Sequence, residues 1–124
     1  MDRDVALWVD HRQAVIAAVA ADTEELSHIS SGVEKHVRFS SSDGGAEDTR
    51  DRRFVTHLNR YYDEVIAAIR GAKAILLLGP GEAKHEIEKR LRDDVLGERI
   101  VGVETVDKMT DHQIAAIARQ RFRA

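Results

Sequence analysis

Residues 73–91, KAILLLGPGEAKHEIEKRL, place a short apolar run directly before the chain's only proline and a charged helical pattern. The run at residues 73–78 is charged only at its start, which is typical of a strand buried on both faces. Such burial requires other elements to cover both sides of the sheet. After the Gly-Pro-Gly turn, Ile87, Leu91 and Val95 share one helical face and Gly97 follows. The segment therefore predicts an α/β fold built on a strand–turn–helix unit.

The N-terminal part of the chain predicts an antiparallel meander. Val5, Leu7 and Val9 alternate with other residues at the period of a strand. A short polar turn, Asp10-His11-Arg12, leads into residues 13–20, whose β-branched residues favour a second strand. Residues 23–30 follow as a third strand, with Leu26 and Ile29 as its apolar members.

The remaining periodic segments complete the fold. Residues 52–71 carry an apolar stripe at spacings of three and four and end in glycine, which predicts a helix. Residues 99–107 predict another strand, joined to residues 73–78 by a right-handed parallel crossover. Thr110 and Gln113 form the T-x-x-Q pattern of a capping box that begins a last helix. Its inward-facing residues are Ile114, Ile117, Ala118 and Phe122.

The resulting order, β-β-β-α-β-α-β-α, is that of the ribonuclease H-like fold. A meander extended by strand–helix–strand units gives a mixed sheet with helices on its faces. No internal repeat or linker interrupts the pattern. We therefore expect residues 1–124 to form a single domain.

Composition narrows the functional classes. The chain has no cysteine, which excludes disulfides and thiolate metal sites. No apolar run approaches the roughly 20 residues that span a bilayer, and the acidic N-terminus lacks the pattern of a secretory signal. The net charge of −3 argues against strong non-specific nucleic-acid binding, although a local basic surface is compatible with it. We expect a cytoplasmic protein that has no membrane association and needs no cofactor.

Residues 31–53 differ from the rest of the chain. Their strongly apolar residues are only Val33, Val37 and Phe39, and three serines precede Asp43-Gly44-Gly45. Such a segment buries too little apolar surface to offset the entropy of ordering. A long loop inside a compact domain is usually functional or disordered. We predict a mobile loop at about residues 40–50.

The strand, the G-P-G-x-x-K turn and the helix resemble the middle domain of archaeal and eukaryotic class-1 peptide release factors and Pelota. Gly79, Pro80, Gly81 and Lys84 match that motif, whereas residues 82–83, Glu-Ala, replace its Phe-Thr. The first hairpin and the strand at residues 100–107 resemble the same domain, so the resemblance covers nearly the whole chain. The chain is closer still to small single-domain bacterial translational machinery proteins. The resemblance implies the ribonuclease H-like fold and a ribosomal partner.

In that family, a mobile loop between the third strand and the first long helix carries Gly-Gly-Gln, whose glutamine assists hydrolysis of peptidyl-tRNA. Here the corresponding loop reads Gly44-Gly45-Ala46, and Ala46 offers no amide. Residues 47–48, Glu-Asp, would repel RNA phosphates. Peptide release is therefore not expected, and the resemblance implies a non-enzymatic domain that associates with the ribosome or ribosomal RNA.

The predicted RNA-binding residues lie on the loop and its edges. They are Lys35, His36, Arg38, Gly44, Gly45, Arg50, Arg52 and Arg53. A second basic group, Arg119, Arg121 and Arg123, is interpreted as the solvated end of the last helix, where cations are favourable.

The Gly-Pro-Gly turn has two interpretations. Backbone N–H groups at the start of a helix can bind an anion, which makes Gly79, Gly81 and Lys84 a weak candidate anion-binding turn. Pro80 removes one donor, however, and Glu82 and Glu86 would repel phosphate. The sequence favours a structural turn that serves the crossover.

Two alternative functions belong to other classes: a metal-dependent nuclease or hydrolase that uses Asp10, and a protein-interaction module. Asp10 ends the first strand, as a metal-binding carboxylate does in nucleases of this fold, but no acid ends the strand at residues 73–78. A turn acceptor is the favoured role for Asp10. The six histidines show no zinc-binding spacing, no catalytic serine motif is present, and no metal site is expected. The other alternative is a protein-interaction module, such as a homodimer formed through an exposed sheet edge.

Overall fold

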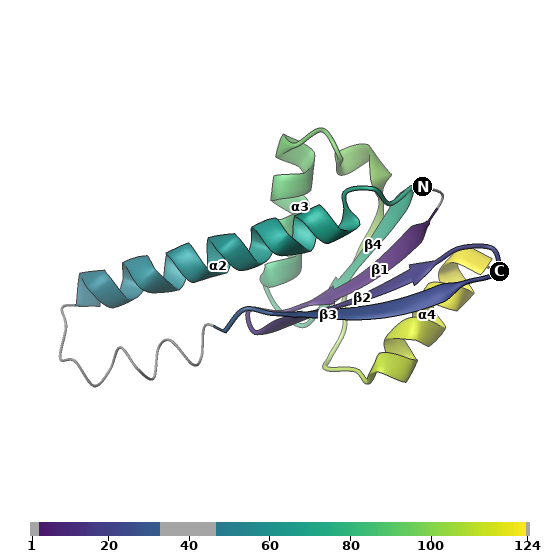
Figure 1. Ribbon diagram of the computed structural model, residues 1–124, viewed down its shortest axis with the longest axis horizontal. Coiled ribbons are helices and arrows are strands. Elements are labelled where there is room, and N and C mark those ends of the chain that lie inside the picture. Colours follow the sequence, from purple (N-terminus) through teal and green to yellow (C-terminus); the bar gives the residue numbers. More distant parts are fainter. Residues whose placement is uncertain (1–2, 33–46, 124) are drawn as a thin grey trace.

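The computed structural model describes residues 3–32 and 47–123, with only the backbone for residues 47–54 (Figure 1). The elements are β1 (Asp4–Val9), β2 (Gln13–Val19), β3 (Glu24–Ser30), α2 (Glu47–Ile69), β4 (Ala74–Gly79), α3 (Ala83–Asp93), the 3₁₀ turn η1 (Gly97–Arg99), β5 (Ile100–Thr105) and α4 (Asp111–Arg123).

The strands form one mixed sheet in the order β3-β2-β1-β4-β5. β1 pairs antiparallel with β2 and parallel with β4, so that Leu7 lies opposite Ile16 on one side and Leu77 on the other. β2 pairs antiparallel with β3, and β4 pairs parallel with β5. This arrangement confirms the predicted ribonuclease H-like mixed sheet and its element order.

Two apolar layers cover the faces of the sheet. On one face, Leu7, Ile75 and Leu77 pack with side chains of α2 and α3. On the other, Trp8 and Leu78 pack against α4. Figure 1 shows the same division, with α2 and α3 on one side of the sheet and α4 on the other. The continuous apolar run of β4 is explained because its side chains alternate between these two layers.

The first long helix starts earlier than predicted. α2 begins at Glu47 rather than at residue 52, so the last part of the predicted loop, residues 47–50, is helical. The acidic residues at its start explain the difference, since carboxylates near a helix N-terminus interact favourably with the helix dipole. The rest of the predicted loop lies outside the described residues.

The prediction for the end of α3 was wrong at Val95. The helix ends at Asp93, and the Val95 side chain is 87% exposed rather than on the buried face. Val95 has a left-handed backbone with φ of 62°. Leu96 N donates to Leu91 O at 2.7 Å and Val95 N to Arg92 O at 3.3 Å, which is the Schellman pattern. The chain reverses there, and Leu96 packs against the core instead of Val95.

The last helix begins and packs as predicted. Thr110 N donates to Gln113 Oε1 at 2.9 Å, and Gln113 N donates to Thr110 Oγ1 at 3.2 Å, which completes the capping box. The four predicted inward residues all contact the core on this face: Ile114 and Ala118 are buried, and Ile117 and Phe122 are partly buried.

Candidate nucleic-acid interface

Helix α2 is only partly packed against the sheet. Its 23 residues give a length of about 35 Å at the usual rise of an α-helix. Among the α2 side chains that the structure describes, at residues 55–69, the buried ones are Tyr61, Tyr62, Val65, Ile66 and Ile69. Between residues 55 and 60, no side chain is fully buried. Figure 1 shows the N-terminal part of α2 extending away from the sheet, and we call residues 47–60 the projecting half.

The structure places the predicted RNA-binding residues in two groups. Lys35, His36, Arg38, Gly44 and Gly45 lie outside the described residues. Arg50, Arg52 and Arg53 lie on the projecting half, where only the backbone is described. Their contribution to RNA binding stays a prediction.

Helical spacing extends this basic group to residues that the sequence analysis missed. Arg50, Arg53, His57 and Arg60 are separated by three, four and three residues, which places them on one face of α2. We call these four residues the basic stripe. Arg60 is exposed and makes no ion pair with a carboxylate in the part of the chain that the structure describes. The i, i+3, i+7, i+10 spacing from Arg50 was visible in the sequence and would have identified Arg60.

The arginines at the end of α4 are in a different situation. Arg119 forms an ion pair with Glu24 on β3 at 2.7 Å, and Arg121 with Glu104 on β5 at 2.7 Å. Arg123 donates to the Thr23 carbonyl oxygen at 2.8 Å. These three arginines are exposed, and their contacts also tie α4 to the sheet. Their charges are locally compensated, which disfavours this surface as a phosphate site.

The Gly-Pro-Gly turn is held together by its own contacts. A Cβ atom on Gly79 would lie 2.3 Å from the Val9 carbonyl oxygen, so the close approach of β1 and β4 requires glycine there. The Lys84 side chain is 2% exposed, and its Nζ donates to Gly81 O at 2.6 Å. Lys84 therefore stabilises the turn from inside. This geometry favours the structural interpretation, and the anion-binding turn of Gly79, Gly81 and Lys84 stays a prediction.

Asp10 is engaged in the turn between β1 and β2. Its Oδ1 accepts hydrogen bonds from the backbone N–H groups of Arg12 and Gln13, each at 2.8 Å. Its carbonyl oxygen accepts a hydrogen bond from the Tyr61 hydroxyl at 2.9 Å. Across residues 3–32 and 55–123, His, Cys, Asp and Glu side chains form no group of three or more that could hold a metal ion. The geometry matches a turn acceptor and offers no support for a nuclease site.

Two further sequence hypotheses concern partners. β3 and β5 form the edges of the sheet, and β5 carries an irregularity where Ile75 pairs with Ile100 but Leu76 pairs with Gly102. Val101 is thus an extra residue in the edge strand, a feature that hinders edge-to-edge pairing. A homodimer through this edge stays a prediction. None of the helices in the described ranges combines the length and apolar character needed to cross a membrane.

The arrangement defines a domain class: a five-stranded mixed sheet with two helices on one face, one of which (α2) projects beyond the sheet, and one helix on the other face. No protein-family model matches the chain, and no curated protein matches its sequence.

Solved structures with the same fold come from Pelota and an archaeal termination factor. Archaeoglobus fulgidus Pelota has a TM-score of 0.60 and 17% identity over 97% of this chain. Thermoplasma acidophilum Pelota has a TM-score of 0.57 and 14% identity over 96%. The archaeal translation termination factor aRF1 has a TM-score of 0.53 and 15% identity over 98%. The chain spans 31%, 38% and 40% of those three chains, respectively. At these identities the similarity establishes a shared fold.

Proposed function

We propose that this chain is a non-enzymatic, translation-associated domain that binds the ribosome or ribosomal RNA. The observation that carries the proposal is the projecting half of α2, which extends a basic stripe beyond the sheet. The fold shared with Pelota and with the termination factor aRF1 supports a role in translation. RNA binding by arginine side chains rests on phosphate neutralisation, and the net charge of −3 then favours a localised contact.

The proposed contact surface combines the basic stripe with the preceding loop. Its residues are Lys35, His36, Arg38, Gly44 and Gly45 in the loop, Arg50, Arg53, His57 and Arg60 of the basic stripe, and the adjacent Arg52. Glycines allow a backbone to approach a partner closely, and the arginines supply the attraction. Ala46 follows the two glycines and has no amide group, so we propose binding without peptide release.

Ribosome co-sedimentation at low and moderate salt tests this function. We expect the wild-type chain to sediment with ribosomes at low salt and to be released as salt rises, because phosphate contacts are salt-dependent. The double variant Arg52→Gln/Arg53→Gln should lose sedimentation. The matched control is Arg119→Gln/Arg121→Gln, which removes the same charge from arginines already paired with acids.

The control should sediment like the wild type. If both double variants are released equally, net charge rather than the α2 surface governs the interaction. If the wild-type chain does not sediment at low salt, the proposed function is wrong.

A further inference from the structure

Polar contacts at Tyr62, just beyond the projecting half of α2, join three separate parts of the chain. The Tyr62 hydroxyl donates to Glu86 Oε1 on α3. His11 Nε2, in the turn between β1 and β2, lies 3.1 Å from the same Glu86 oxygen. One carboxylate oxygen therefore joins α2, α3 and the β1–β2 turn at the point where α2 leaves the sheet.

The neighbouring Tyr61 adds a second anchor. Its hydroxyl donates to the Asp10 carbonyl oxygen at 2.9 Å, and Asp10 is itself fixed by the turn hydrogen bonds at its carboxylate. Both tyrosines are 2% exposed. Burial raises the pKa of both hydroxyls, and the bond to Glu86 raises the pKa of Tyr62 further. The two hydroxyls therefore stay protonated and serve as donors.

Arg90 completes the anchor from α3. Its guanidinium carbon lies 5.0 Å from the centre of the Tyr62 ring, within cation–π range. The same side chain donates to Asn59 Oδ1 and, at 3.3 Å, to Asp63 Oδ1, both on α2. Arg90 thus contacts α2 on both sides of Tyr62.

Apolar packing between α2 and α3 is incomplete at this point. A groove of about 410 Å³ separates the helices and is lined by Leu58, Tyr62, Glu86, Lys89 and Arg90, among others. The groove leaves part of the α2–α3 boundary open, so the polar contacts add to the restraint that the buried Tyr61 and Tyr62 rings place on the helix direction. A helix is stiff, so its direction at the base sets the position of its far end. A rotation of about 10° at Tyr62 would move the start of α2 by about 4 Å, given the usual rise per residue.

We infer that the cluster of Tyr62, Glu86, His11 and Arg90 positions the projecting half of α2 and, with it, the basic stripe. These are positioning residues, since they act through the direction of the helix. What the positioned surface binds rests on the proposed function, but the positioning itself is a property of the free protein.

Pulsed electron paramagnetic resonance can measure the direction of α2 directly. The chain has no cysteine, so Val55→Cys on the projecting half and Asp22→Cys in the β2–β3 turn introduce two unique labelling sites. Both positions are exposed. The labelled parent should give one narrow distance distribution. Glu86→Ala and Tyr62→Phe should each lose it and give a broad one.

Two variants separate positioning from general stability. Glu86→Gln keeps an oxygen that accepts the Tyr62 hydrogen bond, so it should restore the narrow distribution. Arg92→Gln breaks an exposed ion pair that lies entirely within α3, with Glu88 at 2.9 Å, and should leave the distribution unchanged. A variant that merely lowers the free energy of unfolding would not broaden the distances of the folded protein.

The Glu86 side chain is 43% exposed, so Glu86→Ala should fold even if Tyr62→Phe does not. An unchanged narrow distribution in folded Glu86→Ala overturns the inference. A broad distribution that Glu86→Gln restores supports it, whatever ribosome sedimentation shows. Failure of the wild-type chain to sediment concerns the proposed function alone.

Discussion

The two halves of α2 belong to one helix but have opposite surroundings. In the C-terminal half, the five side chains from Tyr61 to Ile69 that face the sheet are buried in the core. In the projecting half, Val55 is 53% exposed and Arg60 faces solvent. Leu58, at the boundary, is only partly buried against the core. The C-terminal half is fixed by packing, whereas the direction of the projecting half depends on the anchor at its base.

This difference teaches that an apolar stripe predicts helix formation but not the extent of burial. The same spacing of three and four residues continues from the buried half into the exposed one. A segment that keeps its helical pattern beyond the core is available for contacts with a partner. Substitutions of similar chemistry in the two halves should therefore have different effects.

Ile69→Ala should give the largest effect. Ile69 is fully buried, and removing its side chain loses apolar burial and leaves a cavity, which costs about 2–5 kcal/mol of unfolding free energy. The matched control, Val55→Ala on the projecting half, should change it by less than about 0.5 kcal/mol, because the side chain is largely exposed. Urea denaturation of both variants measures the contrast. Similar losses in the two variants would show that the projecting half is packed.

The alkaline pH dependence of stability should report the buried tyrosines at the boundary. Their pKa values are raised in the folded protein, above the ordinary value of 10.0, chiefly by burial. Above about pH 10 the unfolded chain loses these protons while the folded protein keeps them, so stability should fall by about 1.4 kcal/mol per pH unit for each tyrosine. Below that pH their contribution is fully present.

The variant Tyr61→Phe/Tyr62→Phe removes both titrating groups. Its unfolding free energy should fall less steeply above pH 10 than that of the wild type, because the variant lacks the two tyrosine protons that the unfolded wild-type chain loses and the folded protein keeps. Parallel curves from urea denaturation at pH 9–11 would contradict the role of these two side chains.

Much of the fold could be predicted because its causes are local. The apolar run before Gly79, the alternation in β1 and the Thr110–Gln113 capping box each predict an element through the spacing of neighbouring residues. Val95 was the exception. Its side chain fits the periodicity of α3, but the helix ends two residues earlier, where the chain must turn back towards β5. That reversal is set by the tertiary arrangement and carries no local signal.

The candidate site likewise contains residues that could be predicted from the sequence and residues that could not. The basic residues of the projecting half could be predicted from composition, and Arg60 could have been found from helical spacing. The anchor of His11, Tyr62 and Glu86 could not, because these residues are distant in sequence and meet only when β1, α2 and α3 assemble. The burial of Lys84 could not be predicted either, because the residues around Gly-Pro-Gly do not indicate whether this lysine faces solvent or the turn.

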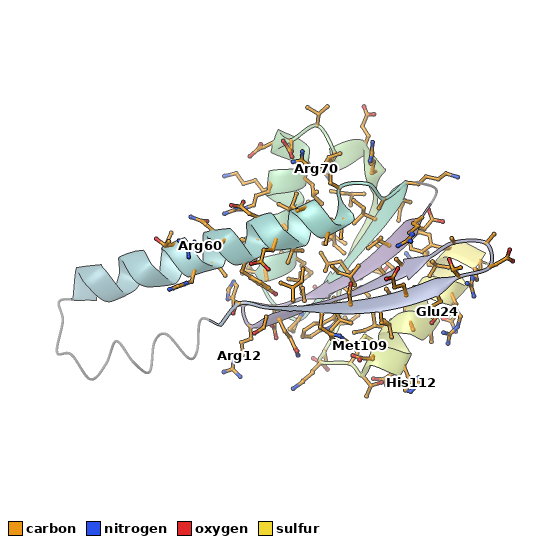
Figure 2. The ribbon with its side chains drawn as sticks, viewed as in Figure 1. Arg12, Glu24, Arg60, Arg70, Met109 and His112 are labelled. Carbon is orange, nitrogen blue, oxygen red and sulfur yellow. The ribbon has the colours of Figure 1, made fainter. Side chains whose placement is uncertain are left out.

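A comparison of Arg60→Gln with Arg70→Gln sharpens the contrast along α2 with the smallest expected effect. Arg60 lies on α2 and Arg70 directly follows its last residue, Ile69; both are exposed, and Figure 2 shows them well separated. Arg60 belongs to the basic stripe, whereas Arg70 pairs with Asp94 at the packed end. If Arg60 contacts one phosphate, its removal should reduce the slope of log affinity against log salt by about 0.7–0.9.

Arg70→Gln removes the same charge and should leave that slope unchanged, because its guanidinium lies away from the proposed contact. Ribosome binding measured across a salt series gives both slopes. Equal reductions would mean that the partner senses only the total charge of the domain, and α2 would then have no directional role. A reduction confined to Arg60→Gln would extend the contact from the predicted arginines at residues 50–53 to the boundary of the core, next to the anchor that sets the direction of the helix.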